Sequence, residues 1–306
     1  MKRLNYFLTG FLIAGVTIGG LNINPVVGHA ATQAAAVKQN DYQNRPDKAA
    51  IEYVVKNKLM WLYPDGNFRP DQTITQADLI AGLSNVKSLS QGVAVPELPA
   101  NHWAKAYYER AKKEGILNGI AINPSKVLTR EEAAQIIVNA WQNVRAFITK
   151  KNDEINKGAS YVQFVSGYKQ MKPKAGKFPN GVATSLYDSF GTLTRADLAY
   201  TLSVLKKDFL EVREAERIAE QMHKSIKISS GFVTVTAPKL GGVLEAKYYI
   251  VTKSGEYLDT LQTGYLKHSL ADTQRVLVSI RNKETNIGLV DYRYSKLPSL
   301  VRERVW

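Results

Sequence analysis

Three short segments of the chain repeat one pattern of apolar, hydroxyl and acidic positions. Each has an apolar residue, then a Thr and, three positions after the Thr, an acidic residue; the pairs are Thr75 with Asp78, Thr129 with Glu132, and Thr194 with Asp197. A Thr at a helix N-cap accepts a hydrogen bond from the backbone N–H three residues on, and an acid at that position bonds back to the N-cap N–H. The pattern therefore predicts three capped helix starts.

Apolar residues recur at helical spacing after each predicted cap. The stripe after the third cap continues past its repeat, through Leu198, Leu202, Leu205, Phe209 and Val212 to Ala219. Helical patterns also precede the first two caps, over 50–59 and 103–113. A Pro-Asp-Gly turn separates helix and cap in the first copy, whereas a basic, Gly-containing stretch over 169–190 replaces that loop in the third. The repeating unit is therefore a helix, an ordered loop and a capped helix.

Beyond residue 230 the apolar pattern changes from helical spacing to alternation. The segments 232–236, 244–251 and 276–280 alternate, and turn-forming residues lie between them. This predicts a small antiparallel β unit over 230–306, for which we recognise no family. The predicted fold class is therefore α+β, with mainly helical repeats followed by a small antiparallel β domain.

The N-terminus has the pattern of a secretory signal peptide, which we assign to residues 1–30. Lys2 and Arg3 precede an apolar run over 7–21, and Gly28 and Ala30 stand at the two positions that a signal peptidase reads. The run is shorter than the roughly 20 residues of a membrane helix, which disfavours an uncleaved anchor. We expect an exported protein with no membrane span in its mature chain.

The amino-acid composition limits the kinds of site and partner that the chain can have. The 306 residues carry a formal net charge of +14, no Cys and only four His. The lack of Cys excludes disulfides and thiolate metal sites, and no serine-hydrolase, zinc-protease or phosphate-loop motif occurs, so we predict no cofactor and no metal. The positive charge favours an anionic partner. Nucleic acid is disfavoured because no recognition helix or aromatic–basic RNA signature accompanies the charge.

Several spaced motifs together resemble the S-layer homology (SLH) domain family. They are the loop Tyr63-Pro64-Asp65-Gly66-Asn67-Phe68-Arg69-Pro70, the caps Thr129-Arg130 and Thr194-Arg195, the segment Asn101-His102-Trp103-Ala104, and residues 114–119. The resemblance covers residues 41–208. It implies three repeats, over 41–90, 91–148 and a degenerate 149–208, whose capped helices meet in a central bundle. A helical extension (209–229) and the β domain (230–306) would follow.

The resemblance also implies a function at the cell surface. In that family, grooves between repeats hold pyruvylated secondary cell-wall polysaccharide, so the chain is expected to be secreted and anchored noncovalently in the cell wall or S-layer. The implied ligand-binding residues are Arg130, Arg195, Trp103, Asp65, Gly66, Gly119 and Gln76. Gln76 stands where the family motif has Arg, so we expect its groove to bind weakly or to be structural.

The residues themselves leave alternatives open at these positions. Arg130 and Arg195 each follow a cap, where the helix dipole disfavours a cation by roughly 0.3–1 kcal/mol, so each should meet an anion. That anion is either a ligand or a carboxylate of a neighbouring repeat, such as Asp65 or Glu97. Trp103 could stack on a sugar, but its spacing favours a core position.

The leading hypothesis is a binding protein without enzymatic activity. One alternative is a structural S-layer or envelope component that self-associates through the β unit. A wall-active hydrolase is a weaker alternative; it would need two carboxylates, for which the β unit offers Glu245, Asp259 and Asp272.

Overall fold

The structure, a computed structural model, describes residues 40–141, 155, 157–158, 160–177, 180–183, 187–260 and 264–305. The predicted signal peptide lies outside the described residues. No helix in the described part is long and apolar enough to cross a membrane. The helices are α1 (Lys48–Lys56), α2 (Gln76–Val86), α3 (Lys105–Lys113), α4 (Arg130–Ala140), α6 (Tyr161–Gly167) and α7 (Arg195–Ser225).

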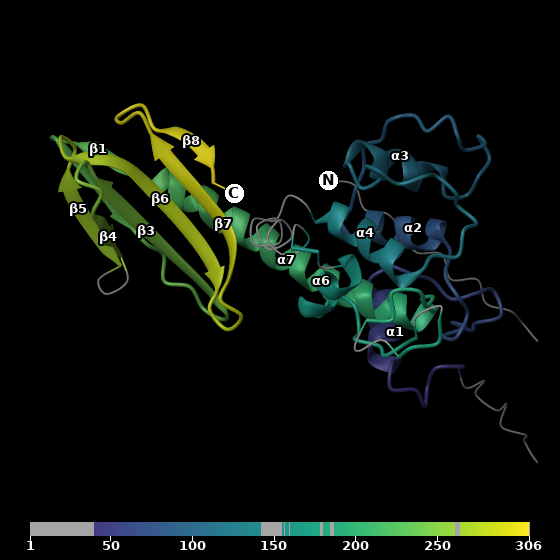
Figure 1. The fold of residues 1–306 in the computed structure, drawn as a ribbon. Coiled ribbons are helices and arrows are strands. Elements are labelled where there is room, and N and C mark those ends of the chain that lie inside the picture. Colours follow the sequence, from purple (N-terminus) through teal and green to yellow (C-terminus); the bar gives the residue numbers. More distant parts are fainter. Residues whose placement is uncertain are drawn as a thin grey trace, which may run out of the picture. The chain divides into compact units, whose positions relative to one another are not determined.

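Helices α2, α4 and α7, labelled in Figure 1, each begin with a complete capping box. The side chains of Thr75, Thr129 and Thr194 accept from the backbone N–H three residues later, and the acid there accepts from the Thr N–H. Each box satisfies two backbone donors that the first turn of a helix leaves without an intrahelical partner. The three helix starts are therefore locally equivalent, although their sequences differ.

Short β-bridges beside the caps join the three units into a closed ring. Thr75 pairs with Val127, Thr129 with Thr192, and Thr73 with Thr194, so each unit bonds to both others. One continuous hydrophobic core fills the ring and includes Phe68, Ile80, Ile137 and Leu202, all completely buried. The degenerate third unit thus completes the ring despite its altered loop.

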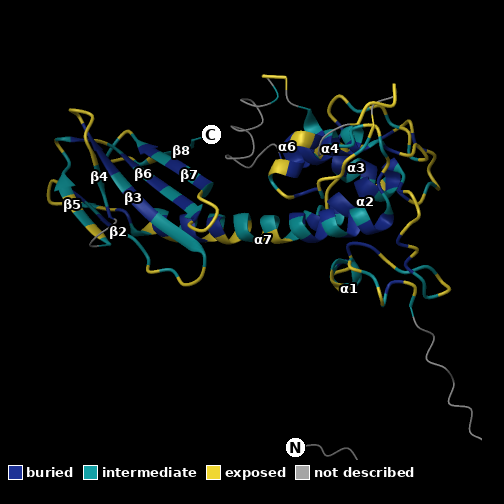
Figure 2. Ribbon diagram, turned by 60° about the horizontal axis from the view of Figure 1, so that its bottom comes forward, coloured by how far each residue is buried: buried dark blue, intermediate teal, exposed yellow. Residues whose placement is uncertain are grey.

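Helix α7 contributes to two separate cores. Its buried residues fall in 195–205 and 215–222, and none of the residues 206–214 is buried. Figure 2 shows the two ends of α7 dark and its middle in teal and yellow. The first stretch belongs to the core of the repeats, and the second packs under the strands that follow.

The strands form two antiparallel sheets. One has the order β1-β2-β5 and the other β4-β3-β6-β7-β8. Their bounds are β1 Lys227–Ser229, β2 Phe232–Thr236, β3 Leu244–Thr252, β4 Tyr257–Asp259, β5 Tyr265–Ser269, β6 Thr273–Asn282, β7 Ile287–Ser295 and β8 Val301–Arg304. The α+β prediction is confirmed, and the three alternating segments are strands β2, β3 and the centre of β6.

The end of α7 and the sheets share one core. Ile218 and Met222 pack with Val233, Tyr248 and Val278, which come from strands in both sheets. The Tyr248 hydroxyl bonds to the backbone carbonyl of Met222, so the polar tip of this buried ring is satisfied. Sequence reasoning treated the helical extension and the β unit as separate, whereas the helix supplies one side of the β unit's core.

Candidate binding site between the repeats

The residue directly after each capping Thr reaches the loop of the next unit around the ring. Its backbone N–H donates to a loop carbonyl there: Gln76 to Lys126 at 2.8 Å, Arg130 to Gly191 at 2.7 Å, and Arg195 to Gln72 at 2.8 Å. The first N–H of a helix has no intrahelical acceptor, so these loops complete the capping of α2, α4 and α7. We call these three contacts the joints of the ring.

Gln76 makes the first joint with its side chain as well. Its Nε2 donates to the Ala121 carbonyl at 3.0 Å, and its Oε1 accepts from the Tyr108 hydroxyl at 2.8 Å and the Asn123 N–H at 2.9 Å. The side chain is 2% exposed. Because both polar atoms of the buried amide have hydrogen-bond partners, Gln76 fixes the loop at a small desolvation cost.

Arg130 makes the second joint. Its Nη2 donates to the Lys172 carbonyl at 2.6 Å, the residue is 0% exposed, and its Nε has no hydrogen-bond partner among the described residues. Burial lowers the pKa of the guanidinium, although Asp197 and Asp188 partly oppose this by their charges.

Arg195 makes the third joint, between α7 and the first loop. Its Nε donates to the Phe68 carbonyl at 2.7 Å and its Nη2 to the Trp61 carbonyl at 2.8 Å. The guanidinium carbon also lies 4.9 Å from the ring centre of Tyr63 and 4.6 Å from that of Phe68. Burial lowers its pKa too.

The carboxylate pairs considered from the sequence for these two Arg residues do not form. Among the described residues, Asp65 pairs with Arg69 at 3.1 Å, and no ion pair joins Arg130 or Arg195 to Asp65 or Glu97. The guanidinium groups instead bond to backbone carbonyls, whose partial negative charge offsets part of the desolvation cost.

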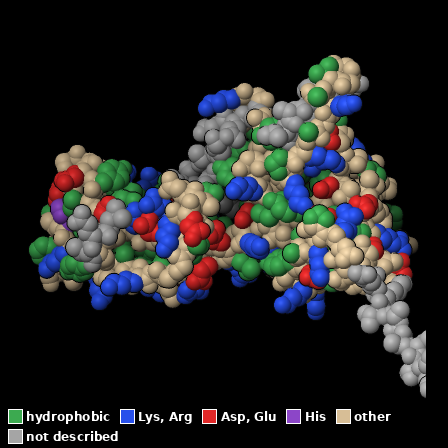
Figure 3. All heavy atoms as spheres, turned by 90° about the horizontal axis from the view of Figure 1, so that it is seen from below, with side chains coloured by type: hydrophobic (Ala, Val, Ile, Leu, Met, Phe, Trp, Pro, Cys, Tyr) green, Lys and Arg blue, Asp and Glu red, His purple; other side chains and the backbone are tan. Residues whose placement is uncertain are grey.

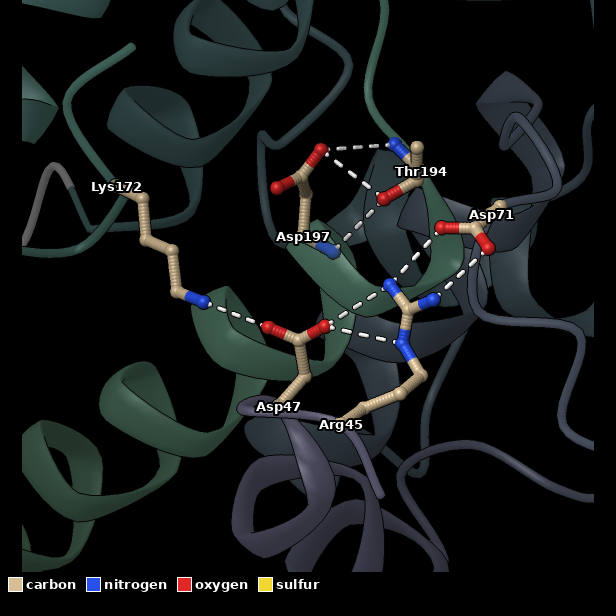
Figure 4. A network of polar contacts seen from close by, with 6 residues as sticks. All are labelled: Arg45, Asp47, Asp71, Lys172, Thr194 and Asp197. Carbon is tan, nitrogen blue, oxygen red and sulfur yellow. Dashed lines mark hydrogen bonds and ion pairs between the residues drawn. The ribbon is translucent and has the colours of Figure 1, made fainter. Parts of the chain in front are cut away.

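A set of ion pairs strengthens the joint between the third and first units (Figure 4). Lys172 bonds to Asp47 at 2.9 Å, and Arg45 bonds to both Asp47 and Asp71. Burial raises the pKa of Asp47, but the contacts with Lys172 and Arg45 outweigh it and hold that pKa below its ordinary value. Lys172, in the basic stretch of the third unit, is therefore bonded to the first unit.

The prediction that Trp103 fills the core is wrong. Trp103 is 52% exposed because α3 begins only at Lys105, so the four-residue spacing that included Trp103 does not lie on one helix. Tyr108 and Ala111 are the buried residues of α3. Trp103 instead packs edge to face against Trp61, with 6.2 Å between the two ring centres. Trp61 is itself 46% exposed. We call these two side chains the tryptophan pair.

A cleft of about 260 Å³ lies at the first joint. Gln76, Gly119, Asn123, Lys126 and Gln135 are among the residues that line it. Gly119 has a φ of +70°, which an L side chain adopts only with strain. The cleft therefore combines amide groups with one ammonium, that of Lys126, and one carboxylate, that of Glu132, which are bonded to each other at 2.5 Å.

The seven predicted ligand residues are distributed over the ring. Gln76 and Gly119 line the cleft at the first joint, Arg130 lies in the second joint, and Arg195 lies in the third. Asp65 and Gly66 form the turn of the first loop, where Asp65 accepts from the Asn67 N–H and Gly66 has a φ of +81°. Sequence reasoning missed Trp61, whose only signal is an aromatic residue shortly before the Pro-Asp-Gly turn.

The three carboxylates considered for hydrolysis have other partners. Glu245 bonds to Arg281 at 2.6 Å, which with Lys247 keeps its pKa below the ordinary value although burial raises it. Asp272 bonds to His268 at 2.8 Å, and Asp259 lies on β4, where its backbone is in register with Tyr249 of β3.

Comparison with known families identifies part of the ring. The family model of the S-layer homology domain matches residues 40–80 and 100–134. These two segments are similar to S-layer homology domains. They contain the first two caps and their loops, and the third unit lies outside both matches.

The S-layer homology segments also relate the chain to larger proteins. It is 31% identical over 98 residues to a cellulosome-anchoring protein of Acetivibrio thermocellus, covering 29% of this chain and 22% of that protein. It is 26% identical over 175 residues to the exoglucanase XynX of Acetivibrio thermocellus (54% and 16%), and 29% identical over 116 residues to the surface-layer 125 kDa protein of Lysinibacillus sphaericus (36% and 10%). The chain thus spans less than a quarter of the length of these relatives. The domain and these relatives point to the cell surface or cell wall.

Proposed function

We propose that the ring of residues 41–208 anchors the protein noncovalently to an anionic secondary cell-wall polysaccharide. The observation that carries the proposal is the tryptophan pair. Large aromatic side chains are usually buried, because burial removes their apolar surface from water. Both indole rings of the pair are instead about half exposed, so a ligand that covers them is favoured. The apolar face of a sugar ring is such a ligand.

The cleft at the first joint offers a second set of contacts, which are polar. Gly119, Lys126 and Gln135 offer a close backbone approach, an ammonium and an amide. Gln76 and Arg195 are then positioning residues, because Gln76 bonds to the loop that lines the cleft and Arg195 bonds to the backbone carbonyl of Trp61. Arg130 has the same role toward the third unit, where it bonds to the Lys172 carbonyl. Pyruvyl groups on the polysaccharide would add the carboxylate that a basic surface favours.

The proposal assigns no catalytic step to the chain. The exoglucanase among its relatives aligns with it over 16% of that enzyme's length. We therefore expect no release of sugar from purified walls, and detection of reducing sugar would argue for the hydrolase alternative.

A sedimentation assay with purified wall sacculi tests the anchoring. We expect the protein to sediment with intact sacculi and to remain in solution when the polysaccharide has been chemically removed. Trp61→Ala/Trp103→Ala should lower the affinity tenfold or more, equivalent to about 1.4 kcal/mol. The control Phe232→Ala/Tyr257→Ala removes two exposed aromatic residues outside the ring and should change the affinity less than twofold. Equal binding to intact and stripped sacculi would contradict the proposal.

Salt separates recognition in the site from attraction by surface charge. Figure 3 shows blue basic side chains spread over one face with red carboxylates between them. Such exposed charges are screened within about 10 Å at 0.1 M salt. We expect wall binding to fall with salt to a plateau. Changing the exposed Lys169, Lys174 and Lys177 to Ala should remove the salt-sensitive part, and the tryptophan double variant should remove the plateau.

A further inference from the structure

A second cleft lies outside the ring, where the two sheets adjoin. Its volume is about 590 Å³, within the range of small-ligand sites. The end of β2, the start of β3 and the turn after β6 form its walls, so it belongs to neither sheet alone. Its polar lining comprises Thr236, Lys239, Glu245, Lys247, Thr260 and Lys283.

Lysines dominate the charge of this cleft. Lys247 is only 7% exposed and bonds to Glu245 at 3.2 Å, while Arg281 takes the same carboxylate at 2.6 Å. One carboxylate is thus shared between two cations. Lys239 and Lys283 are exposed, and the structure gives neither an ion-pair partner among the described residues. The cleft therefore keeps an excess of positive charge.

The rest of the lining suits a ligand with hydroxyl and carbon parts. Thr236 and Thr260 offer hydroxyl groups, and Pro238, Leu240 and Leu244 offer apolar surface. A lysine ammonium is a compact charge that can bond to an anion from many directions, whereas the planar guanidinium of arginine favours a ligand in its own plane. Two free ammonium groups at the rim suit anionic groups on a flexible chain, because each can follow its partner.

From these observations we propose that the cleft between the two sheets binds a phosphodiester-linked polyol chain, with Lys239 and Lys283 holding its phosphates and Lys247 at the floor. The site lies outside residues 41–208 and does not depend on the function proposed for the ring. It gives the sheet region its own contact with a wall polymer, separate from the anchoring polysaccharide.

Titration calorimetry on the full chain at 0.15 M salt tests the site, with short poly(glycerol phosphate) as the probe. Lys239→Ala/Lys283→Ala should weaken binding tenfold or more, and Lys239→Arg/Lys283→Arg should restore most of it. The matched control, Lys227→Ala/Lys253→Ala, removes the same charge from exposed positions outside the cleft, one on β1 and one in the turn after β3. It should stay within twofold of the unchanged protein.

Three outcomes overturn the proposal. The first is no binding of poly(glycerol phosphate), and the second is equal weakening in the cleft and control variants, which leaves surface charge as the only cause. The third is equal or tighter binding of a polyuronate of the same charge, which makes carboxylates the ligand. The tryptophan double variant should bind poly(glycerol phosphate) unchanged, so failure of the ring's function and failure of this one are distinguishable.

Discussion

The two ends of α7 pack in different surroundings. At 195–205 the helix closes the ring of three joints, and its partners include α1, α2 and the loops of the first unit. At 215–222 it packs, among the described residues, with strands of both sheets and the loops between them. Between them, residues 206–214 contribute no buried residue.

This difference shows that a continuous helix does not imply one continuous core. Burial of apolar side chains, not helix length, determines which residues unfold together, because burial supplies most of the stabilising free energy. No residue in the middle of α7 is buried as deeply as those at its two ends, so this stretch adds little stabilising burial and we expect the repeats and the sheets to unfold as separate units.

Cavity-forming substitutions at the two ends test this expectation and have the largest expected effect. Leu202→Ala and Ile218→Ala each remove a buried side chain and should each lower the free energy of unfolding by about 2–5 kcal/mol. In hydrogen exchange, Leu202→Ala should lower protection in α2 and the start of α7, and Ile218→Ala in β6, β7 and the end of α7. The control Leu210→Ala, at a 50% exposed position in the middle, should cost less than about 0.5 kcal/mol. Loss of protection in the same peptides for both variants would mean one cooperative unit.

Asp208, in the middle of α7, should make the stability of the folded chain depend on pH. Asp208 accepts from Gln170 of the third unit at 2.9 Å, and burial raises its pKa from 3.8 to about 6, helped by the nearby charge of Glu211. The folded chain thus binds more protons than the unfolded chain between pH 4 and 6. Stability therefore falls as the pH rises through that window, by at most about 3 kcal/mol.

The substitution Asp208→Asn should remove this penalty while keeping an acceptor for Gln170. We expect the variant to be more stable than the unchanged protein at pH 8, by about 1–3 kcal/mol, and equally stable near pH 3.5. Urea unfolding at both pH values measures this. A variant that is less stable at pH 8 would show that the carboxylate charge itself holds α7 against the third unit.

Removing the helix caps has the smallest expected effect on stability. The effect should be confined to the repeats. Thr75→Ala, Thr129→Ala and Thr194→Ala should each cost about 0.5–2 kcal/mol, because one N-terminal backbone donor loses its acceptor. Replacement by Ser keeps the hydroxyl and should cost less. Exchange protection in β6 and β7 should not change in any of these variants; if it falls after Thr194→Ala, the two ends of α7 are coupled.

Local patterns were sufficient to predict the elements. Thr194 and Asp197 are three residues apart, so their mutual hydrogen bonds depend on little beyond the chain between them. The alternation in 244–251 likewise predicted β3, because a strand with one buried face repeats every second residue. Trp103 was misplaced because helical spacing was extended past the true start of α3 at Lys105.

By itself the sequence determined the three capped helices, their resemblance to S-layer homology domains and the change to strands near residue 230. Only the tertiary structure decided what those elements meet. The Gln76 amide bonds to a residue 45 positions away, and the Arg195 guanidinium to one 134 positions away. The partners of such groups depend on how distant segments pack, and so do the tryptophan pair and the lysine cleft. A capping bond is local and can be read from a few residues, whereas a contact across the fold is set by the burial of the whole core.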